Sequence, residues 1–351
     1  MITLKEIAKR CDVSASTVSN ILNGRPKVSE ETKERVLAVI KETGYQPNFF
    51  AQGIRKQKSR IIGILNEGLD QFSSPDIIEG IMAYCEEKEY RTILVDMRLY
   101  DRWQNRWYNN DKMYNSVLKP SLRELMSIRV DGIIYVAGHA HVIKCFGDDF
   151  ALPAVVAYAY SESGKQPSII IDDEKGGYDA TSYLISKGHR KIGLLLGNAD
   201  NIHTQKREKG YQRALFENEV LYNPNWVYQG SWEKQDGYKA AEMFVRSGVT
   251  AVFAINDRMA VGIYEYLFDN HLTPGKDLSI IGFDNSEYSS YVIPNLTTMN
   301  IPLKEIGRTA AEKLFEELAA DEKGFPRESR ISNEIQVECN LVERDSVKQL
   351  T

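Results

Sequence analysis

Cysteines are few and long apolar runs are missing from this 351-residue chain. The four cysteines are scattered and form no Cys-x-x-Cys pair, so we expect neither a disulfide framework nor a structural zinc site. No apolar stretch approaches the roughly 18 residues that a membrane span needs. The first residues are polar and lack the apolar core of a secretory signal peptide, which favours a cytoplasmic protein.

The motifs of common enzyme classes are also missing. Gly63 and Gly68 have a spacing like that of a P-loop, but Leu69 stands where the phosphate-binding Lys belongs, and no G-x-G-x-x-G follows a strand. There is no G-x-S-x-G or H-E-x-x-H, and His139 with His141 has no third ligand nearby. We therefore expect no catalytic residue, no cofactor and no metal site.

Charge is distributed unevenly along the chain. Residues 1–60 contain 12 Lys and Arg against 6 Asp and Glu, a charge of +6, which leaves −11 for the remainder. A compact basic head attracts nucleic acid, whereas an acidic body is repelled by it. Because a basic segment is also compatible with a solvated surface, charge alone does not decide between these interpretations.

The basic head has the pattern of a helix-turn-helix. Thr3 and Glu6 fit a capping box, and the apolar residues between positions 4 and 11 lie on one helical stripe. Ser14 is placed to cap a second helix, which Gly24 ends. Two short helices around so tight a turn make a DNA-reading unit.

A third helix is expected over residues 30–43, with a stop at Gly44. It closes a small core, and a helical bundle without a role in DNA binding is the alternative. Against that alternative stands the exposed face of the second helix, where short side chains can approach bases and phosphates. These residues are Ala15, Ser16, Thr17, Ser19 and Asn20.

The segments Leu4–Gly24, Val28–Thr32 and Gly44–Asn48 closely resemble the lactose/galactose repressor family. In that family the positions matching Ala15, Ser16 and Asn20 read bases in the major groove, and those matching Thr17 and Ser19 contact the DNA backbone. The DNA-binding residues that we derive from this resemblance are Thr3, Ser14, Ala15, Ser16, Thr17, Ser19, Asn20, Asn23, Arg25 and Ile54.

Two further expectations concern Asn20 and residues 48–60. Many relatives carry Arg at the position of Asn20; because Asn pairs with adenine where Arg prefers guanine, we expect a half-site that differs at that base. Residues 48–60 resemble the family's hinge, which folds on DNA and places an apolar residue, here Ile54, in the minor groove. Gly53 weakens helicity by about 1 kcal/mol relative to Ala, so this hinge is expected to order only on DNA, and a plain linker is the alternative.

Beyond residue 60, short apolar runs alternate with helical stretches, which is typical of buried parallel strands. This rhythm occurs twice and predicts two doubly wound α/β lobes. Several strands end in polar residues, namely Asn66, Asn256 with Asp257, and Asp284 with Asn285, which a cleft between the lobes would gather. The predicted strands are 60–65, 91–96, 131–136, 154–157, 168–172, 191–196, 251–256, 278–284 and 334–342.

Segments 188–193, 207–211, 256–260, 281–286 and 296–298 resemble the effector domain of the same family, so the resemblance covers nearly the whole chain. It implies a helix-turn-helix head and a two-lobed domain like the periplasmic binding proteins. The expected domains are a head over 1–47, a hinge over 48–60, a first lobe over 61–170 and 300–330, and a second lobe over 171–299 and 331–343.

The resemblance also implies an effector site. In relatives the positions matching Arg207, Asn256 and Asp284 hydrogen-bond sugar hydroxyls or another polar effector, and the position matching Trp232 packs an aromatic face on it. Taken singly, each residue has a simpler explanation as a surface charge, a turn former, a cap or a core residue. Phe72 and Tyr158 complete the predicted effector set.

The chain departs from the family in two places. Residues 70–75 replace a more usual Asn-Pro-Phe-Phe, and Phe72 is the residue that can compensate. Residues 98–114, which contain Tyr100, Trp103, Trp107 and Tyr108, form a longer connection than usual. A surface Ω-loop is the simpler interpretation of this insertion, and the alternative is that it reaches the mouth of the cleft or a partner subunit.

These observations together predict a dimeric repressor of carbohydrate-metabolism genes that binds palindromic operator DNA and responds to a small effector, expected to be a sugar. A purine or a sugar phosphate is the alternative effector. A sugar receptor or an enzyme on the same fold is the alternative class of protein. The residues after position 342 are too few for the leucine-heptad tail that makes some relatives tetramers.

Overall fold

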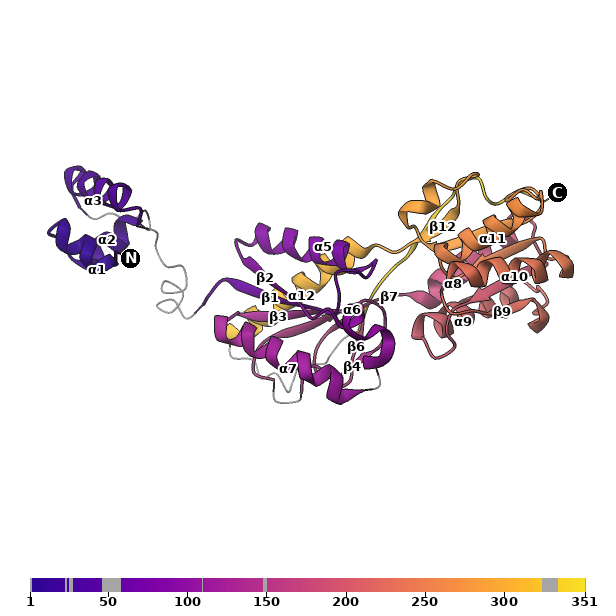
Figure 1. The fold of residues 1–351 in the computed structure, drawn as a ribbon, viewed down its shortest axis with the longest axis horizontal. Coiled ribbons are helices and arrows are strands. Elements are labelled where there is room, and N and C mark those ends of the chain that lie inside the picture. Colours follow the sequence, from indigo (N-terminus) through magenta and orange to yellow (C-terminus); the bar gives the residue numbers. More distant parts are fainter. Residues whose placement is uncertain are drawn as a thin grey trace. The chain divides into compact units, whose positions relative to one another are not determined.

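The structure is a computed structural model that describes residues 2–22, 24, 28–45, 58–108, 110–147, 150–323 and 334–350. The chain forms two compact units, residues 1–60 and 61–351. Figure 1 shows the helices and strands of both units, and each unit has its own core of buried side chains. No described helix is long and apolar enough to cross a membrane.

The first unit contains three short helices whose ends follow from local sequence. Thr3 and Glu6 form both hydrogen bonds of the predicted capping box, and the Ser14 hydroxyl accepts from the Thr17 N–H over 3.1 Å. Gly44 ends the third helix in the left-handed conformation, with φ of 59°. Ile7, Ala8, Cys11, Val18, Ile21 and Val36 form the core. The helices are α1 (Leu4–Arg10), α2 (Ala15–Leu22) and α3 (Glu30–Thr43).

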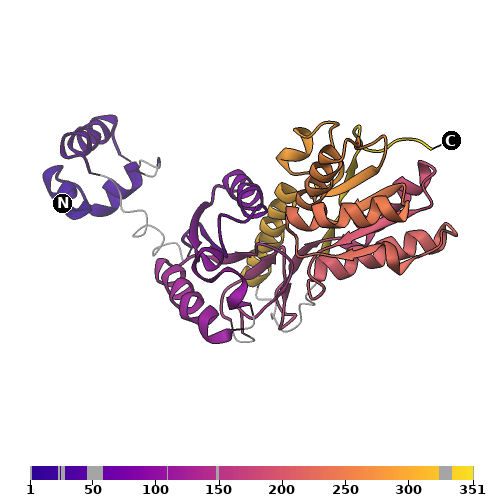
Figure 2. The same cartoon turned by 45° about the vertical axis from the view of Figure 1, so that its right-hand side comes forward.

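The first lobe of the second unit is a parallel six-stranded sheet in the order β13-β7-β5-β3-β1-β2. Helices α5 and α12 pack against each other in this lobe (Figure 2). The strands are β1 (Ile61–Asn66), β2 (Arg91–Asp96), β3 (Gly132–Val136), β5 (Ala154–Ala157), β7 (Ser168–Ile171) and β13 (Glu334–Val337), and the helices are α5 (Ser74–Glu87), α6 (Leu99–Trp103), η1 (Gln104–Trp107), α7 (Asp111–Ile128) and α12 (Leu303–Glu322).

Strand β1 explains why this lobe has two layers of helices. Its side chains alternate, so Ile62 and Ile64 pack in the cluster that contains residues of α5 and α12, whereas Ile61 and Leu65 pack in the cluster that contains residues of α7. A strand buried on both faces reads as one continuous apolar run, and this is the pattern by which the sequence predicted it. A short parallel pair, β4 (Val142–Ile143) with β6 (Tyr160–Ser161), lies beside the main sheet.

The second lobe is a six-stranded sheet in the order β14-β12-β11-β10-β8-β9, parallel except for β14. Helices α8 and α9 pack as one pair and α10 and α11 as another. The strands are β8 (Ile192–Leu196), β9 (Val227–Gln229), β10 (Ala251–Ala254), β11 (Ser279–Asp284), β12 (Thr297–Asn300) and β14 (Asn340–Val342), and the helices are α8 (Asp173–Ser186), α9 (Ile202–Glu217), η2 (Pro224–Trp226), α10 (Lys234–Ser247), α11 (Asp257–Asp269) and η3 (Glu287–Ser290).

The chain passes between the lobes more than once, which corrects one expectation. A single last strand over 334–342, placed in the second lobe, is wrong: residues 334–337 form β13, which pairs with β7 of the first lobe, and residues 340–342 form β14 beside β12 of the second. Two apolar residues are buried at this crossing: Val337 ends β13, and Cys339 lies just before β14. The expected doubly wound α/β architecture is otherwise confirmed.

Candidate functional site

Seven of the predicted DNA-binding residues lie in the described part of the head. Thr3, Ser14, Ser16 and Asn20 are exposed, and Ala15, Thr17 and Ser19 are partly exposed, while Val18 between them is fully buried. The Ser14 hydroxyl lies 2.7 Å from that of Ser16 and 2.9 Å from that of Thr17, so the first turn of α2 carries linked hydroxyls. Asn23, Arg25 and Ile54, with hinge residues 48–57, lie outside the described residues.

The second unit contains a cavity of about 250 Å³ to which both lobes contribute side chains. All six residues of the predicted effector set line it: Phe72, Tyr158, Arg207, Trp232, Asn256 and Asp284. The remaining lining residues are Gln71, Tyr100, Gly138, His139, Asn198, Asn201, His203, Ser231, Glu233, Arg258 and Tyr288. The fold thus brings the whole predicted set together, although its members are spread over more than 200 positions of sequence.

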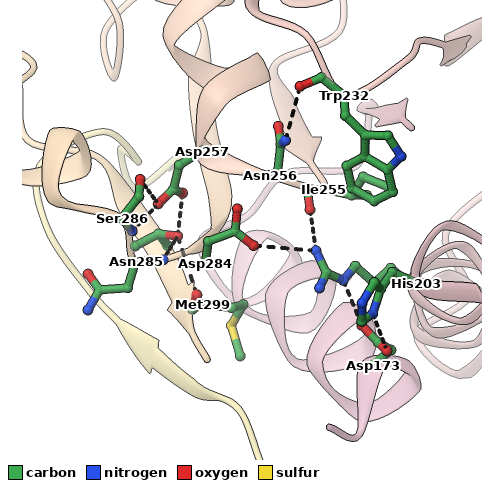
Figure 3. Close-up of polar contacts among 12 residues, drawn as sticks. Asp173, His203, Trp232, Ile255, Asn256, Asp257, Asp284, Asn285, Ser286 and Met299 are labelled. Atoms are coloured by element: carbon green, nitrogen blue, oxygen red, sulfur yellow. Dashed lines mark hydrogen bonds and ion pairs between the residues drawn. The ribbon is translucent and has the colours of Figure 1, made fainter. Parts of the chain in front are cut away.

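Arg207 is the most buried charge of this cavity, with 2% of its side chain exposed. Its Nε donates to Asp173 Oδ1 over 2.8 Å, its Nη1 donates to the carbonyl of Ile255, and the same nitrogen lies 3.7 Å from Asp284 Oδ1 (Figure 3). The guanidinium also stacks on the Phe283 ring at 3.6 Å. These contacts orient the guanidinium between Asp173 and Asp284.

The pKa values of Asp173 and Asp284 shift in opposite directions, although Arg207 lowers both. Burial alone raises the pKa of Asp173, but the charges of His203 and Arg207 outweigh it and lower the pKa to about 2. Burial raises the pKa of Asp284 well above its ordinary value, and Arg207 offsets this only in part. Asp173 is therefore the firm partner of Arg207, whereas Asp284 is available to a ligand.

Three of the predicted effector residues have backbone conformations that L-residues rarely adopt. The φ angles are 65° at Tyr158, 74° at Trp232 and 112° at Asp284. Such conformations cost of order 1–3 kcal/mol and persist only where the surrounding structure enforces them. Their occurrence at three positions around one cavity supports a role for these side chains in ligand binding.

The 98–114 insertion contributes one side chain to the first-lobe wall. Tyr100 lines the cavity, and its hydroxyl donates to Glu67 Oε2 over 3.2 Å and contacts the hydroxyl of Tyr108. Tyr108 also reaches His139 Nε2 at 2.6 Å. Because Tyr100 and Trp107 are buried and the segment is largely helical, the surface-loop interpretation is wrong and the insertion reaches the cavity.

Glu67 accepts hydrogen bonds from two residues of this wall, Tyr100 and Gly138. It is fully buried, accepts the Gly138 N–H over 2.8 Å and the Tyr135 hydroxyl over 2.7 Å, and lies 3.0 Å from His141 Nε2. Burial lowers the pKa of His141, but the Glu67 charge outweighs it and the pKa is raised. The Glu67 carboxyl and the His141 imidazole therefore lie against each other beside this wall.

Sequence reasoning missed several residues of the cavity and misplaced three, Asn66, Asp257 and Asn285, none of which lines it. Asp173 follows the end of β7, so the rule of polar residues at strand ends would have found it, but Tyr100, His139 and His203 give no such signal. Asn66 was expected in the cleft and instead binds Asp96 over 2.9 Å without lining the cavity. Asp257 accepts the Thr298 hydroxyl and the Ser286 N–H behind Asp284, outside the lining set.

A larger and more open cavity of about 430 Å³ lies over α8, but its charged groups are already satisfied. Lys175 pairs with Asp179 at 2.6 Å, Arg213 with Glu174 at 2.6 Å, and Lys206 donates to the Tyr160 hydroxyl. We therefore assign the candidate site to the smaller cavity. Within the described residues, no group of three side chains is placed to hold a metal ion.

Comparisons with known proteins agree with this architecture. Residues 3–48 match the family described as bacterial regulatory proteins, lacI family, and residues 181–347 match the periplasmic binding protein-like domain. The chain is 32% identical to the HTH-type transcriptional repressor PurR of Vibrio campbellii over 100% of both chains. It is 31% identical to the ribose operon repressor of Haemophilus influenzae, over 91% of this chain and 92% of that one.

Solved structures of the same fold align along most of the chain. A lac repressor dimer bound to operator and the anti-inducer ONPF superposes with a TM-score of 0.77 at 24% identity, over 99% of both chains. A LacI family regulator from Enterococcus faecium with bound ribose gives a TM-score of 0.62 at 24% identity, over 83% of this chain and 100% of that one. With a helix-turn-helix head, two doubly wound lobes and relatives that match it from end to end, the chain belongs to the lacI family of bacterial regulatory proteins and is a transcriptional regulator.

Proposed function

We propose that this regulator is a dimeric repressor whose binding to palindromic operator DNA is controlled by a neutral sugar in the cavity between its lobes. The observation that carries the sugar assignment is the group formed by Arg207, Asp284 and Asn256 opposite aromatic side chains. Arg supplies donors, a carboxylate supplies acceptors and an amide supplies both, which is what adjacent hydroxyls require. The ribose operon repressor relative supports the same assignment.

Charge balance in the cavity argues against a sugar phosphate. No Lys is among the lining residues, and its two arginines are already paired. Arg207 is held by Asp173, and Arg258 lies 3.3 Å from Glu233 Oε1. A phosphate group would therefore meet no unpaired cation, although phosphate recognition normally relies on one.

A purine is the second candidate effector. The cavity has flat aromatic walls in Phe72, Tyr100, Tyr158 and Trp232, which suit a planar ring as well as a sugar face. Several relatives are purine repressors by name. The small volume favours one ring system in either case, because about 250 Å³ corresponds to roughly eight water volumes.

The exposed hydroxyls of α2 and the match to the family's head support operator binding, with residues 48–60 acting as the hinge. Two heads on one palindrome require a two-fold dimer, and the lac repressor that superposes on this chain is a dimer on operator. We further infer that the protein acts in the cytoplasm by binding rather than by catalysis, since its relatives are transcriptional repressors.

The effector class is tested by thermal unfolding of the full-length chain with D-ribose, D-galactose, ribose 5-phosphate, hypoxanthine and guanine in turn. A ligand present at 100 times its Kd adds about 2.7 kcal/mol to the free energy of unfolding. We expect a shift with a neutral monosaccharide and none with the phosphate. A shift with only the purines, or with only the phosphate, would overturn the sugar assignment.

Two variants decide whether a shift comes from the cavity. Asp284→Asn keeps the size of the side chain but changes its acceptors, and it is expected to abolish the shift. Arg213→Met on α9 removes a cation whose pair with Glu174 lies outside the cavity, and it is expected to leave the shift unchanged. Equal shifts in both variants would place the ligand elsewhere.

A further inference from the structure

His203 joins the two lobes through its two ring nitrogens. It lies in the first turn of α9 in the second lobe, and 4% of the residue is exposed. Nδ1 lies 2.8 Å from Asp173 Oδ2 at the start of α8, and Nε2 accepts the Ala140 N–H over 3.0 Å. Ala140 belongs to the first lobe, between β3 and β4. One imidazole thus bonds to both lobes beside the cavity.

The two partners determine the protonation of this imidazole. A backbone N–H can only donate, so Nε2 must carry a lone pair and Nδ1 must carry the hydrogen that Asp173 accepts. Burial lowers the pKa of His203, and although Asp173 raises it, the pKa remains below its ordinary value. The neutral form that the geometry requires is therefore also the form that prevails at neutral pH.

Asp173 connects this imidazole to the cavity. Its Oδ2 accepts from His203, and its Oδ1 accepts from Nε of Arg207, so the carboxylate has one oxygen for each partner (Figure 3). Arg207 lines the cavity and lies beside Asp284. Because all three side chains are almost fully buried, a shift of Arg207 changes its bond to Asp173 and, through Asp173, the environment of His203.

The loop that receives the His203 bond is part of the opposite wall. Gly138 and His139 line the cavity, and the Gly138 carbonyl accepts the Ser73 hydroxyl over 2.7 Å. The Gly138 N–H is held by Glu67. Lys206 makes a second bridge from α9 to the first lobe, through the Tyr160 hydroxyl, but it has no hydrogen bond to Asp173. His203 is therefore the bridge that is continuous with Arg207.

We propose that His203 is a positioning residue that couples occupancy of the cavity to the placement of the first-lobe loop at Ala140, through Asp173 and Arg207. A ligand that moves Arg207 changes the His203–Ala140 bond, and this bond favours one relative placement of the lobes. The proposal rests on the function proposed above in taking the cavity as the effector site. In this role His203 acts through the arrangement of the lobes and does not itself have to contact DNA or the partner subunit.

Hydrogen exchange of the Ala140 amide tests the connection in the full-length protein without any ligand. His203→Asn keeps a donor near the position of Nδ1 but lacks Nε2, and we expect it to speed exchange at Ala140 by about tenfold or more, because that amide loses its acceptor. Arg207→Met removes the far end of the connection and is expected to speed the same exchange, although Arg207 does not touch Ala140. Arg258→Met is the matched control from the same cavity and is expected to leave it unchanged.

Each outcome decides the proposal. Faster exchange in His203→Asn but not in Arg207→Met would show that His203 only caps a backbone group, which would overturn the coupling. If Arg207→Met does not fold, Arg207→Lys serves in its place, since it keeps the charge but lacks the Nε–H that Asp173 accepts. Equal acceleration in Arg258→Met would mean general loosening of the cavity and would also count against the proposal.

A functional measurement separates coupling from a purely structural role. Operator DNA selected from a random pool is titrated with the full-length protein, with and without D-ribose as the probe. We expect His203→Asn to bring the ratio of the two operator affinities towards one, while Lys206→Met keeps more of the wild-type ratio. An unchanged ratio in His203→Asn would overturn the coupling. If D-ribose does not alter operator binding by the wild type, D-ribose is not the effector, whereas the exchange experiment still decides the role of His203.

Discussion

The side-chain amide of Asn256 serves two elements at once. Its Oδ1 accepts the Met259 N–H over 2.8 Å and so caps α11, while its Nδ2 donates to the backbone carbonyl of Trp232 over 3.3 Å. Trp232 has a φ of 74°, so this bond helps to hold a strained residue at the cavity. The helix cap and the aromatic wall of the site therefore depend on the same side chain.

Asn256→Asp separates these two roles. A carboxylate caps a helix as well as an amide does, so the free energy of unfolding is expected to stay within about 0.5 kcal/mol of the wild type. The donor to Trp232 is lost, and we expect the affinity for the effector to fall about tenfold, the equivalent of one good hydrogen bond. Asn256→Ala, which removes both bonds, is expected to lose stability as well, by about 1 kcal/mol. Wild-type affinity in Asn256→Asp would show that the Trp232 bond does not position the site.

Close packing of α8 on α9 underlies the geometry of Arg207. A Cβ on Gly177 would lie 2.4 Å from the Arg207 carbonyl, so Gly177→Ala is expected to push the helices apart and cost about 1–3 kcal/mol in urea unfolding, together with a loss of effector binding. Gly147→Ala is the matched control, because a Cβ there meets nothing within 4 Å. A destabilisation of the same size in both variants would contradict this explanation.

Because the pKa of Asp173 is lowered in the folded protein, we expect the free energy of unfolding to fall in acid. Its pKa is about 2 in the folded protein against 3.8 for the unperturbed group, so the unfolded chain takes up this proton first as the pH falls. The contribution, about 2 kcal/mol, is fully present above about pH 4 and is lost towards pH 2. We expect the stability difference between wild type and Asp173→Asn to shrink over this range in urea titrations at successive pH values. A difference that does not change with pH would show that the carboxylate is not the group responsible.

The insertion is expected to affect ligand selection more than folding. Tyr100→Phe removes a hydroxyl that contacts Glu67, Tyr108 and His139, and it should lower the free energy of unfolding by about 1 kcal/mol. Because Tyr100 lines the cavity, we expect the ranking of ligand affinities to change in the same variant. Tyr84→Phe, on α5 and outside the cavity, is the control for removal of a hydroxyl. An unchanged ranking in Tyr100→Phe would limit the insertion to a structural role.

Operator preference tests the role of Asn20 on α2. Asn is suited to adenine and Arg to guanine, so Asn20→Arg is expected to change one base of each half-site from adenine to guanine in a selection from random DNA, with about 1–3 kcal/mol of discrimination. Arg10 precedes α2 and lies in the last turn of α1; Arg10→Met is expected to weaken binding to all sequences alike. Recovery of guanine by the wild type would disprove the assignment.

Local patterns were enough to predict most elements. The capping box at Thr3, the Gly44 stop and the apolar run of β1 each depend on neighbours in sequence, and each was found where it was expected. The six effector residues were predicted from a resemblance, and the fold gathers them because the strands that precede Asn256 and end at Asp284 are adjacent in one parallel sheet. The last strand was predicted wrongly because an apolar pattern gives the strand but not the sheet that it joins.

The sequence by itself determined the class of this protein: a basic helix-turn-helix head, an acidic body of two α/β lobes, and the residue types of a polar, aromatic-lined site. Only the tertiary structure decided which groups satisfy one another. Asp173, His203 and Ala140 are distant in sequence, and their bonds form because three crossings of the chain hold the second lobe, with α8 and α9, against the first. Burial and neighbouring charges together then set each pKa: the partners of Asp173 lower its pKa despite burial, whereas burial raises the pKa of Asp284 despite Arg207.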